Sequence, residues 1–266
     1  MPVLCDLPSA SIDQNRFHEI DRTVTGSAFA VHNSLGRFFD EQIYQAELSE
    51  SCARSGLSTR LEVPITASHK EFSKIYYVDF VAENSVPYEL KAVEALAGSH
   101  HNQLLNDLLL LEWKHGKLLN FRPPSLESRF VSTTSNHAER MPLAVHDREW
   151  IETCPEDELL KSRLLDLLRD LGLFLEVSLY REALLKLMEK DSLGFKEVEI
   201  HSAGGVLGSH RMCLLDRETA WHLSAVRDHF ETYGIHLTRL ISHSNLRRLH
   251  WINLNHRQVN LKTFKK

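Results

Sequence analysis

The sequence predicts an α/β protein made of two similar units, each with the element order αβββαβ. Three observations lead to this prediction. Apolar residues recur at helical spacing in two stretches near the N-terminus. Three segments rich in β-branched and aromatic residues follow, and then a further helix and strand. The same order of elements recurs, with weaker local matches, after residue 155.

Two amphipathic helices are expected first. The earlier one covers residues 24–35, where every third or fourth residue is apolar and Gly36 ends the run. The second covers residues 40–55 and ends before a glycine. Its inner side is expected to carry Ile43, Leu48 and Cys52. Both helices need a sheet to cover their apolar faces.

Five strands and one further helix are expected after these helices. The links between the first three strands are short, which indicates an antiparallel meander. A helix over residues 99–114 then crosses over to add the fourth strand. The strands are expected at residues 61–65, 72–81, 86–93, 118–121 and 129–131.

Three ionisable residues stand inside these otherwise apolar strands: Asp79, Glu89 and Lys91. Side chains alternate across a strand, so Glu89 and Lys91 share a face that Asp79 can also reach. Two converging carboxylates repel each other unless a cation lies between them, and such oxygen ligands suit Mg²⁺ or Mn²⁺. A neighbouring lysine can orient or help deprotonate a water, or stabilise charge on a phosphate. The alternative is a solvated sheet face with an ordinary Glu/Lys pair.

Residues 23–131 resemble the bacterial GxxExxY protein family, a branch of the PD-(D/E)XK nuclease superfamily. Each matching segment is short, but together they keep the family's order and approximate spacing. The segments lie within residues 28–36, 41–44, 77–79, 88–94, 103–106 and 118–121.

The resemblance implies a catalytic centre that depends on Mg²⁺ or Mn²⁺. Asp79 and Glu89 would be direct metal ligands, together with the backbone carbonyl of Leu90. Lys91 would be the catalytic lysine. The implied activity is hydrolysis of phosphodiester bonds in DNA, or less favourably RNA, by a metal-activated water.

Two helix residues receive roles from the same resemblance. Glu41 would approach the metal as a further ligand, and Gln103 would position the nucleic-acid backbone or the lysine. For both residues the alternative is an ordinary place on a helix surface. Two departures from the family pattern concern substrate binding. Phe38 replaces a glycine and is expected to crowd the entrance, and Asp107 replaces a tyrosine and is expected to add negative charge where a phosphate passes.

The second half reads as a degenerate copy of the first, which makes the chain an internal pseudo-dimer. The alignment places Glu176 at the position of Glu41. It also places Cys213, His222 and Ser224 at the positions of Asp79, Glu89 and Lys91. The alternative is a helical accessory domain that resembles the first half by chance. The expected segments are an N-terminal extension (1–22), a nuclease-like domain (23–131), a linker (132–155) and the degenerate repeat (156–266).

The charge of the chain is unevenly distributed. The formal net charge is −5, yet no acidic residue follows Glu231. Such asymmetry can mark a phosphate-facing surface, and the alternative is a solvated helix face with a frayed tail. The candidate phosphate-binding residues are Arg239, Arg247, Arg248 and Arg257.

The remaining features narrow the class of protein. The four cysteines are widely spaced and form no CxxC pair, which favours reduced thiols in a cytoplasmic protein. No apolar stretch is long enough for a membrane span.

Taken together, these features make a cytoplasmic metal-dependent nuclease acting on DNA or RNA the leading hypothesis. The rival is a non-catalytic nucleic-acid-binding or protein-interaction module. A monomer fits the internal pseudo-dimer, and a homodimer stays open.

Overall fold

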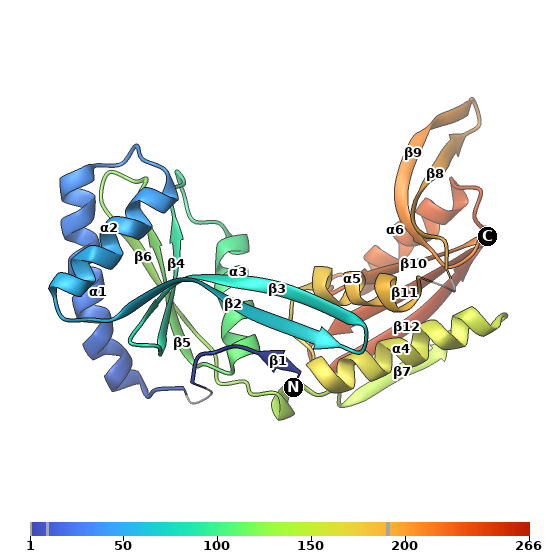
Figure 1. Ribbon diagram of the computed structural model, residues 1–266. Coiled ribbons are helices and arrows are strands. Elements are labelled where there is room, and N and C mark those ends of the chain that lie inside the picture. The colour runs from blue at the N-terminus through green and yellow to red at the C-terminus, as the bar shows by residue number, and fades with distance from the viewer. Residues whose placement is uncertain (1, 9–10, 190–191) are drawn as a thin grey trace. The chain divides into compact units, whose positions relative to one another are not determined.

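The computed structural model describes residues 2–8, 11–189 and 192–266 (Figure 1). The chain divides into two compact units. The N-terminal unit holds residues 2–68 and 73–139, and the C-terminal unit holds residues 69–72 and 140–266. Each unit contains a six-stranded sheet. Three residues of the expected N-terminal extension, at positions 1, 9 and 10, lie outside the described residues.

The sheet of the N-terminal unit has the strand order β1-β2-β3-β4-β5-β6. Strands β4 and β5 are parallel, whereas β3–β4 and β5–β6 are antiparallel. Helices α1 and α2 cover one face of the sheet and α3 lies on the other (Figure 1). The elements are β1 (Val3–Leu4), α1 (Gln14–Leu35), α2 (Glu41–Arg54), β2 (Thr59–His69), β3 (Phe72–Ala82), β4 (Val86–Lys91), α3 (Gly98–Leu111), β5 (His115–Asn120) and β6 (Glu127–Ser132).

Helices α1 and α2 differ in detail from the sequence prediction. Helix α1 begins at Gln14, ten residues early, because Asp13 caps it by accepting a 2.9 Å hydrogen bond from the amide of Arg16. The expected domain start at residue 23 therefore falls inside a helix. In α2 the expectation for Ile43 was wrong, since 43% of this side chain is exposed and the neighbouring Tyr44 is buried instead.

The sheet of the C-terminal unit has the strand order β7-β12-β11-β10-β9-β8. The expected linker and frayed tail are both corrected here, because β7 lies within residues 132–155 and pairs in parallel with the C-terminal strand β12. The elements are the 3₁₀ helix η1 (Ala138–Arg140), β7 (Ala144–Glu149), α4 (Pro155–Leu171), α5 (Val177–Leu187), β8 (Gly194–Ser202), β9 (Gly205–Leu214), β10 (Thr219–Ser224), α6 (Phe230–Ser242), β11 (Arg248–Asn255) and β12 (Gln258–Lys265).

The two units share one topology. In each, two helices precede three strands, a helix follows, and two strands complete the sheet. The third and fourth of these strands are parallel in both units, and the helix between them makes the crossover. The prediction that the element order repeats is therefore confirmed. The units differ in one added edge strand: β1 lies beside β2, the first strand of its meander, whereas β7 lies beside β12, the last strand of its unit.

A tyrosine clasp supports the repeat at the level of side chains. The hydroxyl of Tyr44 donates to the carbonyl of Gly36 at 2.9 Å, and that of Tyr180 donates to the carbonyl of Gly172 at 2.6 Å. Each glycine ends the first helix of its unit with a φ of 73°. Each hydroxyl also accepts from a backbone amide at 3.1 Å. The same turn is thus tied down twice in the chain.

An asparagine brace recurs at the end of the parallel strand pair. The side chain of Asn120 accepts from the amide of Val93 at 3.0 Å and donates to its carbonyl at 2.8 Å. Asn253 makes the same two contacts with Val226, at 2.7 and 2.9 Å. A buried amide group that satisfies both backbone groups fixes where the chain leaves the sheet.

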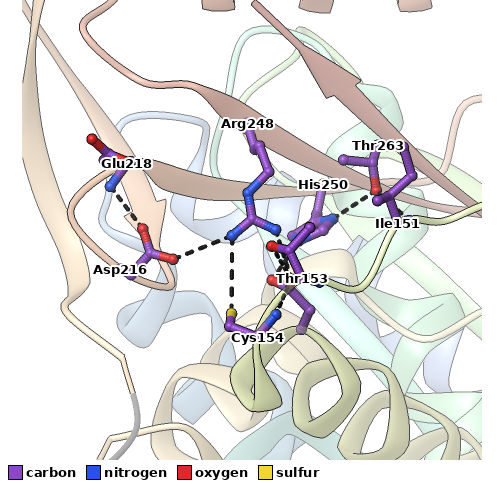
Figure 2. A network of polar contacts seen from close by, with 9 residues as sticks. Ile151, Thr153, Cys154, Asp216, Glu218, Arg248, His250 and Thr263 are labelled. Atoms are coloured by element: carbon purple, nitrogen blue, oxygen red, sulfur yellow. Dashed lines mark hydrogen bonds and ion pairs between the residues drawn. The ribbon is translucent and has the colours of Figure 1, made fainter.

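A helix-to-strand ion pair recurs in the middle of each unit. Lys117 Nζ lies 2.7 Å from Oδ2 of Asp21. In the C-terminal unit, His250 Nε2 lies 2.8 Å from Oδ1 of Asp157, and the guanidinium of Arg248 lies 2.6 Å from Oδ2. Figure 2 shows the polar network around Arg248 and His250. Three separate contacts therefore support a duplication of the whole fold.

Replacing Asp157 with alanine is expected to lower the free energy of unfolding by about 3–5 kcal/mol, because it removes the carboxylate partner of the buried His250 and leaves Arg248 with only the more distant Asp216. Burial opposes ionisation, but hydrogen bonds from His250, Thr153 and Arg248 hold the pKa of Asp157 far below its ordinary value. The stabilisation is present above the ordinary pKa of aspartate and is lost as the pH falls below it. Urea unfolding measures the change. The control Asp216→Ala, at the exposed edge of the network, is expected to cost at most about 1 kcal/mol, and equal costs would contradict this account.

The structure also bears on the cysteines and on membrane insertion. The four cysteines, Cys5, Cys52, Cys154 and Cys213, are all unpaired. Within the part of the chain that the structure describes, no helix combines the length and apolar character needed to cross a membrane.

Candidate functional site

The carboxylates and the lysine of the predicted site come from the neighbouring strands β3 and β4. Tyr88 and Leu90 on β4 point into the apolar core under α1 and α2. Because side chains alternate across a strand, Glu89 and Lys91 lie on the opposite side. The antiparallel register between the two strands places Asp79 beside Glu89.

Lys91 brings three carboxylates together. Its Nζ lies 2.5 Å from Oε1 of Glu89. The same atom lies 3.4 Å from Oδ2 of Asp79 and 3.4 Å from Oε1 of Glu41. Asp79 Oδ2 also accepts a 2.9 Å hydrogen bond from the amide of Leu90, which fixes its orientation. The strand residues therefore meet at one point, and Glu41 reaches them from the first turn of α2.

Burial disfavours the charged forms of these carboxyl groups. Together with the nearby charge of Asp79, it raises the pKa of Glu89 to about 8. Burial also raises the pKa of Asp79 and that of Glu41. The centre as it stands therefore disfavours three full negative charges. An added cation would favour the ionised carboxylates.

The lysine is held in its protonated form. Burial opposes the charge of Lys91, but the carboxylates of Glu89 and Asp79 raise its pKa above the ordinary value for lysine. A protonated ammonium group cannot accept a proton from water. The electrostatic role predicted for this lysine is therefore favoured over the proton-abstracting one.

Glu89 has the surroundings of a metal ligand. Its side chain is fully buried, Oε1 lies 2.5 Å from Lys91 Nζ, and Oε2 has no hydrogen-bond partner among the described residues. Across those residues, no group of three or more His, Cys, Asp or Glu side chains is placed to hold a metal ion. Mg²⁺ commonly takes only one or two carboxylates and completes its shell with waters and phosphate. Asp79, Glu89 and the carbonyl of Leu90 fit that pattern, whereas Glu41 serves here as a partner of Lys91.

Two residues near the site were missed by the sequence analysis. Gln45 donates to the backbone carbonyl of Asp79 at 2.5 Å and to Oε1 of Glu62 at 2.8 Å. Gln45 lies one turn after Glu41, and this helical spacing could have indicated it. Glu62 has a positive φ of 49° within β2, and no sequence pattern marks such a position.

The other predicted helix and loop residues fall outside this cluster. Gln103 is half-buried on α3 and makes no hydrogen bond or ion pair with another described residue. Phe38 is 78% exposed, and its ring centre lies 5.3 Å from the guanidinium carbon of Arg37. The expectation for Asp107 was wrong, because this residue is only 2% exposed and cannot face a passing phosphate.

Arg248 is not available as a phosphate-binding residue. Its guanidinium group is largely buried and lies 2.6 Å from Oδ2 of Asp157. It also lies 3.5 Å from Oδ2 of Asp216, a contact drawn in Figure 2. The sequence prediction is corrected here, since two carboxylates already neutralise this charge. Its role is to hold strand β11 against the start of α4.

The other three candidate arginines are scattered rather than gathered at one site. Arg239 is exposed on α6. Arg247 is exposed and lies 3.1 Å from Glu218. Arg257 donates to the backbone carbonyl of Met141 at 2.9 Å. Their contribution to nucleic-acid binding stays a prediction.

The C-terminal unit has a different set of residues at the equivalent position. Lys91 and Ser224 each pair with the brace asparagine of their own unit. His222 therefore takes the place of Glu89, as the sequence alignment predicted. The lysine and the buried carboxylate are both absent from this unit's copy of the site.

One strand match in the sequence alignment was displaced by one residue. Cys213 occupies the ladder position of Phe80, because each pairs with the aromatic residue directly before the position of Glu89. Met212, rather than Cys213, therefore corresponds to Asp79. Residues 212–215 are apolar throughout, so the sequence has no alternation there that could distinguish the two registers.

The helix match was also displaced by one residue. The tyrosine clasps align Tyr44 with Tyr180. Glu41 lies three residues before its tyrosine, and Val177 lies three residues before the other. Val177, not Glu176, therefore takes the place of Glu41.

Comparison with known proteins identifies the family of the N-terminal unit. Residues 18–131 match the family model described as the PD-(D/E)XK nuclease superfamily. The match includes every member of the cluster around Lys91. No curated protein matches the chain. The predicted superfamily is thus confirmed, and its GxxExxY branch stays a prediction.

Proposed function

Because residues 18–131 belong to the PD-(D/E)XK nuclease superfamily, we propose that this protein is a nuclease that depends on Mg²⁺ or Mn²⁺. Its substrate is DNA, or less favourably RNA, and its catalytic centre lies at the ends of β3 and β4. The C-terminal unit is a second, non-catalytic copy of the fold.

One observation carries this proposal: the fully buried Glu89 lies beside Asp79, with the ammonium group of Lys91 2.5 Å from Oε1 and no hydrogen-bond donor for Oε2 among the described residues. A buried carboxylate with an oxygen that accepts no hydrogen bond is costly unless a cation compensates it. The lysine compensates part of this charge, and a divalent ion bound between the two carboxylates would compensate the rest. That arrangement suits a function more than it suits stability.

Each residue of the centre has a distinct role. Asp79 and Glu89 would hold a divalent ion, which would supply a water of lowered pKa and neutralise charge on the phosphate. The amide of Leu90 fixes the orientation of the Asp79 carboxylate. The ammonium group of Lys91 faces the same point and stabilises negative charge that develops on the phosphate. Glu41 keeps this ammonium group in position.

A non-catalytic binding module is the second candidate function. The observation that favours it is the 2.5 Å separation between Lys91 Nζ and Glu89 Oε1, because this pair partly neutralises the site without a metal. The two functions differ in metal binding. A module that only binds nucleic acid or protein has no need to take up a divalent ion at Asp79.

Cleavage of a nucleic-acid panel tests the proposed function. The panel contains linear, circular, single-stranded and branched DNA together with RNA, each with and without Mg²⁺ or Mn²⁺. Metal-dependent cleavage by the wild-type chain that is lost in both Asp79→Ala and Lys91→Ala supports the nuclease and identifies its substrate. Absence of cleavage by the folded wild-type chain, or cleavage that survives both substitutions, would favour the binding module or a contaminating nuclease.

A further inference from the structure

The C-terminal unit lacks the negative charge of the catalytic centre at the equivalent position. The three carboxylates of the N-terminal site correspond there to Val177, Met212 and His222. The position keeps a polar character but no longer offers oxygen ligands to a hard cation. Its chemistry therefore calls for a different ligand.

His222 is oriented from α6. Its Nε2 lies 2.7 Å from the hydroxyl of Tyr233, and the two ring centres are 5.8 Å apart. No other hydrogen bond of His222 is formed within the described residues. A neutral histidine bonded to a tyrosine hydroxyl keeps one donor for an anion: either the second ring nitrogen or the hydroxyl, according to the tautomer.

Arg181 adds a positive charge from the helix that corresponds to α2, whose Gln45 contacts the backbone of Asp79 in the N-terminal unit. It lies on α5 directly after the clasp tyrosine, where the N-terminal unit has Gln45. It is half-buried and makes no hydrogen bond or ion pair with any residue that the structure describes. Burial, and then the charges of Arg181 and His210, lower the pKa of His222. The charged groups acting on His222 are therefore both basic.

Ser224, at the lysine position, is not a replacement nucleophile. Its hydroxyl donates to Oδ1 of Asn253 at 2.6 Å and accepts from Nε1 of Trp251 at 2.9 Å. The residue is buried. Because both hydrogen bonds of this hydroxyl group are made to buried residues of the same unit, its role is structural. The position accordingly supports binding rather than a second hydrolytic centre.

We propose that this position in the C-terminal unit, which corresponds to the proposed cation site of the N-terminal unit, binds a phosphate group of a nucleic-acid backbone through Arg181, His222 and Tyr233. The choice of nucleic acid as the source of the phosphate rests on the proposed function. The binding of an anion does not, because it follows from the residues of the C-terminal unit alone. A guanidinium group is well suited to phosphate.

Binding measured without metal tests this inference. The full chain carrying Asp79→Ala is titrated in EDTA against fluorescent single- and double-stranded DNA and RNA oligonucleotides over a series of salt concentrations. Arg181→Gln introduces the residue of the N-terminal unit and is expected to weaken binding about three- to tenfold at low salt. The slope of log Kd against log salt should change by about one. His222→Gln should weaken binding in the same direction.

A matched control and a second probe make the result decisive. Arg169→Gln removes the same charge from an exposed position on α4 and should leave both Kd and slope unchanged. Inorganic phosphate, followed by NMR of the histidine side chains, separates the two sources of the ligand. An effect of Arg181→Gln on phosphate alone would assign the site to a free phosphate compound. Equal behaviour of Arg181→Gln and Arg169→Gln with both probes would overturn the inference.

The failure of this inference can be distinguished from failure of the nuclease. If the wild-type chain cuts no substrate but its binding depends on Arg181, the phosphate site is supported and the nuclease proposal is contradicted. If cleavage depends on metal but neither Arg181→Gln nor His222→Gln changes binding, the nuclease proposal is supported and the phosphate site is contradicted.

Discussion

Replacing Lys91 with alanine is expected to lower the rate of metal-dependent cleavage by at least about 100-fold. The ammonium group is the positive side-chain charge held between the carboxylates of Asp79 and Glu89. Alanine removes that charge from the point where the phosphate would gain negative charge. Initial rates measured with Mg²⁺ at saturating metal test this expectation.

Two control variants separate catalysis from folding. Lys114→Ala removes an exposed lysine directly before β5 and should leave the rate unchanged. Lys91→Arg keeps the charge but changes its shape, so its rate should fall between those of the wild type and the alanine variant. Circular dichroism confirms that each variant is folded. A folded Lys91→Ala chain that retains half or more of the activity would remove Lys91 from the mechanism.

Glu89→Gln is expected to abolish metal-induced stabilisation while improving the stability of the metal-free protein at alkaline pH. Burial and the charge of Asp79 raise the pKa of Glu89 from 4.5 to about 8. The folded metal-free chain therefore holds a proton that the unfolded chain has lost between these values. Its stability falls as the pH rises through that window. Glutamine carries no titrating proton, so this loss should disappear.

Thermal unfolding with and without metal checks both parts of the prediction. Metal competes with the proton on Glu89, so the Tm increase of the wild type should be larger near about pH 9 than near about pH 6. Glu89→Gln should show little metal-induced increase at either pH. Glu50→Gln, exposed on α2, should behave like the wild type. A metal response in Glu89→Gln equal to that of the wild type would show that this carboxylate is not a ligand.

The site was predictable from sequence where it depended on strand alternation. Glu89 and Lys91 are two residues apart on one strand, so their common face follows from local geometry alone. The contacts of Gln45 and Arg248 depend instead on partners far away in the chain. Arg248 meets Asp157 across 91 residues, and a run of basic residues does not reveal such a partner. The sequence therefore predicts that Arg248 binds phosphate, whereas in the structure its charge stabilises the fold through Asp157.

The fold was predictable where apolar periodicity was strong. The central strands and helices of the N-terminal unit were anticipated, but α1 begins early because a polar cap at Asp13 starts it. The sequence predicts a linker where the structure has strand β7, because most side chains of this edge strand are exposed and show no apolar periodicity. The alignment of the repeats needed the ladder register, because the continuous apolar run at residues 212–215 matches equally well when it is shifted by one residue.

The most direct test of a metal centre in one copy and not in the other is a crystal of the full chain soaked in Mn²⁺ and measured near the manganese absorption edge. We expect an anomalous peak between the carboxylates of Asp79 and Glu89, and none beside Met212 and His222. A peak at the second position, or no peak at the first while the crystal binds Mn²⁺ elsewhere, would contradict the assignment of the catalytic centre.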